Sequence, residues 1–227
     1  KRSVAVILGD PGLNDIVKPN NQFDEDDHHT INELKKALQK IKDYRYTYYS
    51  NHGSLLKTLI NNKDGIDFVF NLCDEGYNNE AIKELHVPAL LEILDIPYTG
   101  GTPQCLAFCY DKSLVRGIAK ELDLPVPEAY IIKPEDTTFF EFPLQFPVIV
   151  KPNSGDSSFG ITMENVCYDI NQLDNVILKL REKLCFDINI LVEEFLTGKD
   201  LSVGIIGNLP DAYTVLPVIE EDYSSLP

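Results

Sequence analysis

Lys151 stands at the end of an apolar run and is followed directly by a loop of small residues. Residues 146–150 read Phe-Pro-Val-Ile-Val, and residues 153–160 contain three serines and two glycines. Backbone N–H groups and hydroxyls in such a loop can wrap a phosphate while the lysine ammonium neutralises its charge. The pattern therefore predicts a phosphate-binding loop, and a flexible hairpin is the alternative. The glycine patterns of P-loop and dinucleotide-binding proteins are absent.

Two further segments carry residue types suited to a nucleotide. Lys112 follows Asp111 where a helix is expected to begin, and its alternative interpretation is a solvated surface lysine. Residues 190–203 leave an apolar strand through acidic residues and then re-enter a strand. An extended linker exposes backbone groups that suit a purine edge, and a nearby carboxylate suits ribose hydroxyls. A charged edge strand with a turn is the alternative for this segment.

Other polar clusters have simpler explanations. The acids at residues 24–27 precede a helical pattern, so they are expected to cap a helix rather than to bind a metal. His28 and His29 are adjacent, and adjacent helical residues point in different directions. The five cysteines are odd in number and scattered without a C-x-x-C pair, so we expect buried thiols in a reducing compartment.

Composition bounds the protein class. The chain has 227 residues, 44% of them hydrophobic, which is enough for one large domain or two small ones. Its 20 basic and 36 acidic residues give a net charge of −16, which opposes non-specific attraction to nucleic acid or anionic lipid. No apolar run approaches the roughly 20 residues of a bilayer span. With no secretion signal in view, we expect a cytoplasmic protein in which any phosphate is bound locally.

The pattern of elements predicts an α/β fold with a parallel sheet in the first half and a mostly antiparallel sheet in the second. Strands at 4–8, 46–49 and 68–72 alternate with helical patterns, which is typical of a doubly wound parallel sheet. The second half predicts an α+β unit with a mostly antiparallel sheet. Its expected elements are helices at 111–122 and 173–184 and strands at 129–132, 147–150, 188–192, 201–206 and 213–218. A resemblance to one enzyme superfamily, carried by the motifs together, implies an N-terminal domain at 1–104, a central ATP-binding subdomain at 105–196, and the start of an incomplete C-terminal domain at 197–227.

Taken together, these motifs resemble the ATP-grasp superfamily, most closely the D-alanine-D-alanine ligase family. The resemblance rests on the order of five segments: 94–100, Asp111-Lys112, 124–127, the Lys151 loop and 192–198. It implies that Lys112 and Lys151 contact ATP phosphates and that a serine-rich loop closes over them. The remaining implied ATP contacts are Ser157, Ser158 and Gly160 in that loop, Glu193, Glu194, Phe195 and Leu196 at an adenine-holding hinge, and Asp200 at the ribose, where relatives commonly have glutamate.

Several departures limit what the resemblance transfers. The turn after the first strand lacks the serine and glutamate with which such ligases orient the first amino acid, so D-alanine should not be assumed. Glu75 and His86 are candidate substrate contacts, against a solvated loop acid and an ordinary helix histidine. The magnesium ligands of the family are expected beyond Pro227, so the chain is expected to be an N-terminal part of a longer ligase, with no metal site of its own. Glu220, Glu221 and Asp222 are expected to be solvated charges at a frayed end.

The leading hypothesis is ATP-dependent ligation of a carboxylate to an amine through an acylphosphate, with ATP and Mg²⁺ as cofactors. Its catalytic residues stay unassigned, and this chain by itself is expected to have little activity. The expected partners are small carboxylate and amine substrates, namely amino acids, with neither nucleic acid nor membrane. Dimers are common among similar ligases, so a homodimer is one expectation. The alternatives are a non-catalytic nucleotide-binding module with an ATP-grasp-like fold and a fold relative that binds no nucleotide.

Overall fold

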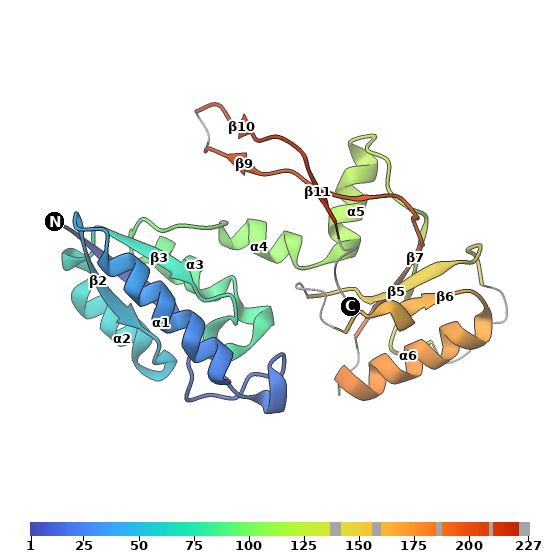
Figure 1. Cartoon of the computed structure of the whole chain (residues 1–227), viewed down its shortest axis with the longest axis horizontal. Helices are drawn as coiled ribbons and strands as arrows, with labels where there is room; N and C mark the ends of the chain where they lie inside the picture. Colours follow the sequence, from blue (N-terminus) through green and yellow to red (C-terminus); the bar gives the residue numbers. More distant parts are fainter. Residues whose placement is uncertain (137–141, 156–159, 185–187, 209–210, 223–227) are drawn as a thin grey trace.

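The computed structural model describes residues 1–136, 142–155, 160–184, 188–208 and 211–222. Its first half contains a three-stranded parallel sheet in the order β2-β1-β3, as the alternation of strands and helices predicts (Figure 1). The elements of this half are β1 (Arg2–Leu8), α1 (Glu25–Gln39), β2 (Tyr44–Tyr49), α2 (His52–Asn62), β3 (Phe68–Leu72) and α3 (His86–Ile93), with short 3-10 turns at Pro19–Asn21, Lys63–Gly65, Tyr77–Asn79 and Ala81–Lys83.

The central strand β1 is buried on both faces, which explains its unbroken apolar run. Val4 and Val6 pack into a cluster that includes Leu38 of α1. Ile7 points the other way, into a cluster with Leu55 and Leu59 of α2. Because successive strand residues face opposite sides of a sheet, one apolar strand feeds two cores.

The acidic residues before α1 cap that helix, as expected. Asp24 accepts hydrogen bonds from the N–H groups of Asp26 and Asp27, and the Asp27 side chain accepts one from the N–H of Asp24. This reciprocal capping box satisfies donors that the first turn leaves without helical partners. Across the described ranges, no three His, Cys, Asp or Glu side chains are placed to share a metal ion.

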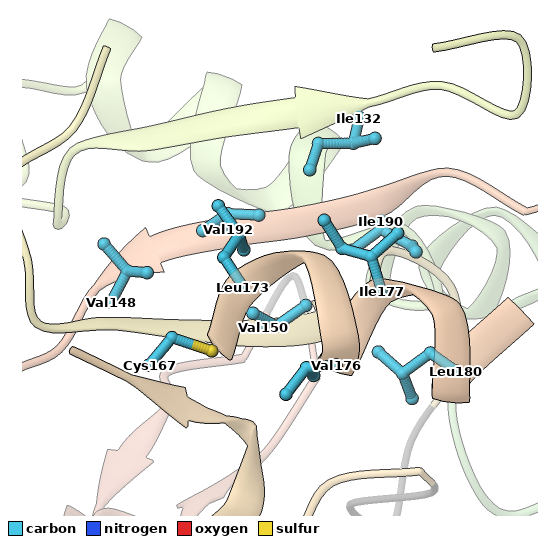
Figure 2. Close-up of a cluster of buried hydrophobic side chains, with 10 residues drawn as sticks. All are labelled: Ile132, Val148, Val150, Cys167, Leu173, Val176, Ile177, Leu180, Ile190 and Val192. Atoms are coloured by element: carbon cyan, nitrogen blue, oxygen red, sulfur yellow. The ribbon is translucent and has the colours of Figure 1, made fainter. Parts of the chain in front are cut away.

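The second half contains a four-stranded antiparallel sheet in the order β4-β7-β5-β6. Its strands are β4 (Ala129–Ile132), β5 (Val148–Pro152), β6 (Val166–Cys167) and β7 (Ile190–Glu194), with a 3-10 turn at Met163–Asn165. Helix α6 (Ile170–Leu184) covers one face, and Figure 2 shows the side chains buried between them. They are Ile132, Val148, Val150, Cys167, Leu173, Val176, Ile177, Leu180, Ile190 and Val192.

Two helices join these halves: α4 (Pro103–Cys109), which the sequence pattern did not predict, and α5 (Lys112–Glu121), which it did (Figure 1). Residues 80–94, whose apolar side chains have helical spacing, form a 3-10 turn followed by α3. Pro88 is the third residue of α3, where a missing N–H costs no helical hydrogen bond.

The last described residues form two narrow ribbons. Strand β8 (Asp200–Ser202) pairs with β11 (Ile219–Glu221), and β9 (Ile205–Ile206) pairs with β10 (Thr214–Val215). The predicted strands at 201–206 and 213–218 are therefore broken into shorter pieces. Glu220 and Glu221 are exposed, as expected, but they lie in the paired strand β11, and Glu220 pairs with Lys199 at 2.9 Å, so the expectation that they belong to a frayed end was wrong. No helix in the described part of the chain has the length and apolar character to cross a bilayer.

Candidate active site

Lys151 and Glu193 meet on the sheet face opposite α6. Strands β5 and β7 pair antiparallel, with Ile149 opposite Glu193, so Lys151 lies diagonally across from Glu193 on the same face. The Lys151 Nζ atom is 2.7 Å from Oε2 of Glu193, and Nη1 of Arg116 in α5 is 3.4 Å from Oε1. Only 9% of the Glu193 side chain is exposed. Glu193 is therefore a buried carboxylate, and it forms ion pairs with two cations.

The start of the small-residue loop is fixed to the start of α5. Asp111 caps α5 by accepting from the N–H groups of Ser113 and Leu114. The buried Asn153 side chain donates to Asp111 Oδ1 at 2.9 Å and accepts from both the N–H and the hydroxyl of Ser113. One asparagine therefore ties the loop after β5 to the helix that carries Lys112.

Lys112 reaches the same loop. Its Nζ donates to the carbonyl of Gly155 at 2.7 Å, and its backbone N–H donates to the carbonyl of Asn153 at 3.0 Å. Gly155 has φ +106°, a left-handed conformation that favours glycine, and its N–H donates to the carbonyl of Tyr110. The residues that the sequence singled out from two distant segments, Lys112 and the Lys151 loop, thus lie in direct contact.

The far end of the loop returns to β5. Gly160 has φ +76°, and its carbonyl accepts from Nδ2 of Asn165 at 3.1 Å. The same Asn165 nitrogen donates to the carbonyl of Val150 at 2.9 Å. The loop is therefore clamped at both ends by buried asparagines. Ser157 and Ser158 lie outside the described residues.

The acidic segment after β7 is only partly packed. The N–H of Glu194 donates to the carbonyl of Glu128, and the N–H of Phe195 donates to the carbonyl of Pro147. Phe195 is half-buried beside a cavity of about 340 Å³, whereas Glu194, Leu196 and Asp200 are exposed. Within the described ranges, no hydrogen bond or ion pair joins Leu196 or Asp200 to either lysine.

A second cavity, of about 550 Å³, lies at the carboxyl ends of β1 and β3. Glu75 lines it with a side chain that is only 14% exposed, so the expectation of a solvated loop acid was wrong. Its Oε2 atom is buried without a hydrogen-bond partner among the described residues. Burial, with the nearby charge of Asp74, raises the pKa of Glu75 to about 7. His86, the other candidate, is exposed at the start of α3.

Lys18 is the cation of this cavity. Its Nζ lies 2.8 Å from Asp27, 3.4 Å from Glu75 and 4.4 Å from the centre of the Phe23 ring. Burial acts to lower the pKa of Lys18, but the hydrogen bond to Asp27 and the charge of Glu75 outweigh it, so the pKa is raised. Glu75 also packs closely against Gly9. A Cβ atom at position 9 would lie 2.5 Å from the Glu75 carboxyl carbon, so a side chain there would clash with Glu75.

A buried histidine holds the strand ends that frame this cavity. His52 Nδ1 accepts from the N–H of Asn78 at 2.7 Å, so Nε2 carries the proton and donates to the carbonyl of Leu8 at 3.0 Å. Its backbone N–H donates to Asp10, whose own N–H donates to the Asn79 side chain. These contacts join the end of β1 to the turn after β3.

Sequence reasoning missed Arg116, Asn153, Asn165 and Lys18. Arg116 and Lys18 carry no local pattern that separates them from other surface cations, and each acquires its role from a partner far along the chain. Asn153 offered a signal, because it directly follows Lys151-Pro152 at the entry to the loop.

The sequence is similar to proteins of one ligase family. A model described as "D-ala D-ala ligase C-terminus" matches residues 118–225. An uncharacterised protein, y4sG, of Sinorhizobium fredii is 33% identical over 67% of this chain and 42% of its own length. A D-alanine–D-alanine ligase of Carboxydothermus hydrogenoformans is 29% identical over 82% of this chain and 57% of its own length. The chain thus spans about half the length of these relatives.

Solved structures share the fold. The D-alanine–D-alanine ligase from Bacillus anthracis complexed with ATP matches 99% of this chain and 69% of that protein, with a TM-score of 0.69 at 21% identity. The VanG D-Ala:D-Ser ligase from Enterococcus faecalis matches 97% of this chain and 69% of that protein, with a TM-score of 0.60 at 19% identity.

Proposed function

Because the chain is a D-alanine–D-alanine ligase-like protein with the ATP-grasp fold, we propose that it is part of an ATP-dependent ligase that joins a carboxylate to an amine. In that reaction the substrate carboxylate attacks the γ-phosphate of ATP, and an amine then displaces phosphate from the acylphosphate. Protein catalysis of such a transfer rests on positioning and on neutralising charge.

The observation that carries the proposal is that Lys112 is hydrogen-bonded to the loop that directly follows Lys151. Lys112 bonds the loop that follows β5, and Lys151 is the strand residue that precedes this loop. Two lysines next to one small-residue loop suit the polyphosphate of a nucleotide, even in a protein with net charge −16. We therefore assign the ATP phosphates to Lys112, Lys151 and the loop up to Gly160, with Ser157 and Ser158 as proposed members.

For Glu193 we propose a positioning role, in place of the adenine contact that the resemblance implies for it. Both of its carboxylate oxygens face cations, so its side chain fixes where the Lys151 ammonium points. We propose that the segment 194–196 lies along the adenine and that Asp200 serves the ribose. The exposure of Glu194, Leu196 and Asp200 leaves their side chains accessible to such a ligand.

We propose that the Glu75 cavity takes a substrate amino group. In open parallel sheets, ligands bind outside the carboxyl ends of the strands where the strand order reverses. In the order β2-β1-β3 that point lies between β1 and β3, where Glu75 lines the cavity. A buried carboxylate oxygen without a partner is suited to an ammonium donor, so amino acids are the proposed substrate class.

In this proposal, Mg²⁺ enters the site bound to ATP. Over the described ranges, no cluster of three or more His, Cys, Asp or Glu side chains fits a metal ion. Among the residues that the structure describes, we therefore assign none to Mg²⁺.

Calorimetric titration with a non-hydrolysable ATP analogue tests the phosphate site. We expect Lys151→Ala to weaken binding at least tenfold, because one charge-assisted contact contributes about 1.5–3 kcal/mol. Lys179→Ala is the matched control, because Lys179 is exposed and its ion pair among the described residues is with exposed Glu164 at 2.8 Å. Equal binding by wild type and Lys151→Ala, with both proteins folded by circular dichroism, would contradict the assignment.

A further inference from the structure

Two of the cysteines form a pair on α4. Cys105 and Cys109 are one turn apart, both are exposed, and their Sγ atoms are 4.0 Å from each other. The expectation of buried thiols was therefore wrong for this pair, although it is confirmed for Cys73 and Cys167. Cys185 lies outside the described residues.

The pair differs chemically from the two buried thiols. Burial raises the pKa of Cys167 to about 11 and that of Cys73 further still, and neither side chain is open to a reagent. Burial, together with the hydrogen bond to Cys105, also raises the pKa of Cys109. A ligand for the pair must therefore take up protonated thiols, not merely attract thiolates.

The helix decides which ligand fits. Side chains four apart have Cβ atoms about 5–6 Å from each other, whereas a disulfide needs Cβ atoms about 3.5–4.5 Å apart. An intact α4 therefore disfavours a direct S–S bond. A single thiophilic atom that bonds both sulfurs can span the larger gap.

We propose that Cys105 and Cys109 form a dithiol site for a thiophilic centre that takes two sulfur ligands, the class represented by monosubstituted trivalent arsenicals. The reaction with an arsenical oxide balances as R–As=O plus two thiols giving R–As(S)₂ plus water. Two As–S bonds form, and the oxide oxygen leaves with both thiol protons. The arsenic stays trivalent, so no oxidant is needed.

The position of the pair gives the site a structural context. The carbonyl of Tyr110, which follows α4, accepts from the N–H of Gly155, and the next residue caps α5. The helix that carries the pair therefore ends next to the loop assigned above to phosphate. The dithiol site itself does not depend on that assignment.

The test uses the full chain with Cys185→Ser as background and phenylarsine oxide as the probe. We expect one arsenic to remove two thiols from titration with Ellman's reagent and to add one phenylarsenic group to the intact mass. A small dithiol should reverse the binding, and the same concentration of a monothiol should not.

Variants separate a paired site from two independent thiols. Cys105→Ser and Cys109→Ser should each bind phenylarsine oxide at least 100-fold more weakly, because tethering a second ligand raises affinity by about 10²–10⁴. The matched control is Ala107→Cys combined with Cys109→Ser, which keeps two exposed thiols on α4 at positions that do not face each other. Binding by this control as tight as in the background protein would overturn the proposal, as would a mass loss that reports a disulfide.

Discussion

Glu193 is a buried acid whose charge is compensated by Lys151 and Arg116. Removing its carboxylate leaves these two cations without this partner. Their side chains are largely buried, with 26% of Lys151 and 14% of Arg116 exposed. We expect Glu193→Ala to lower the free energy of unfolding by about 3 kcal/mol, near the low end for breaking a buried pair. Urea denaturation measures this change.

Glu194→Ala is the control for that experiment. Glu194 is the next residue but is exposed, and exposed substitutions usually change stability by less than about 0.5 kcal/mol. If both variants lose the same free energy, the two cations do not depend on Glu193.

Glu75 makes stability depend on pH. Its pKa is about 7 in the folded chain, against an ordinary value of 4.5. Between these values the folded state binds more protons than the unfolded state, so the free energy of unfolding falls as pH rises from 4.5 to about 7. The Glu75 contribution to this fall is roughly 3 kcal/mol at most.

Glu75→Gln should remove that part of the pH dependence. We expect the stability of the variant relative to wild type to increase as the pH is raised from 5 toward 8, as measured by urea denaturation at each pH. The control is Glu135→Gln, an exposed acid in the other half of the chain. A constant difference between Glu75→Gln and wild type across this range would show that Glu75 does not titrate as inferred.

For single residues, the sequence identifies candidate site residues better than it identifies the side chains that they contact. The positions of Lys112 and Lys151 follow from local patterns, at a helix start and at a strand end. The pairing of Lys151 with Glu193 depends on the register of β5 against β7, which no local pattern encodes. The burial of Glu75 likewise depends on Gly9 and Lys18, which are distant in the sequence.

Among the elements, the junction of β5 and α5 is the best defined part of the candidate site. Asn153 is 2% exposed and bonds both Asp111 and Ser113. We expect Asn153→Ala to cost about 2–3 kcal/mol, because it leaves buried polar groups without partners. It should also weaken binding of the ATP analogue, since Lys112 and the loop lose their common anchor.

Thermal denaturation and calorimetry measure the two effects of Asn153→Ala. Asn175→Ala is the matched control, because Asn175 is exposed in the middle of α6. An Asn153→Ala protein that is destabilised but binds the analogue as wild type does would limit Asn153 to a role in folding.

Elements with strong periodicity were predicted well. The strands at 68–72 and 129–132 agree with β3 and β4 in both bounds, and Asp111 begins α5 as its cap. Helix α4 was missed because it has only seven residues and two cysteines, which gives no clear apolar stripe. The ribbons β8–β11 and β9–β10 were predicted as longer strands because apolar residues run through the exposed turns between them.

The whole molecule has separate hydrophobic cores on either side of α4 and α5. The clusters of the first half draw on residues 4–98, and that of the second half draws on residues 130–192. The proposed domain boundary at 104/105 falls inside α4, and the one at 196/197 falls between β7 and β8. We propose that the two halves unfold independently.

Leucine truncations in each core test this independence. Leu59→Ala and Leu180→Ala each remove a buried side chain, and such changes cost about 2–5 kcal/mol. We expect hydrogen exchange to accelerate only in the half that carries the substitution. Acceleration in both halves from either variant would show a single cooperative unit.

The placement of Phe195 has an optical consequence. The chain has 11 tyrosines and no tryptophan, so Phe195→Trp would introduce its single indole. Phe195 is half-buried, it follows β7, and it lines a cavity with Pro147 and Glu194. Excited at wavelengths that tyrosine does not absorb, that indole would report the surroundings of the proposed adenine segment alone, so its emission could follow occupancy of the segment in real time.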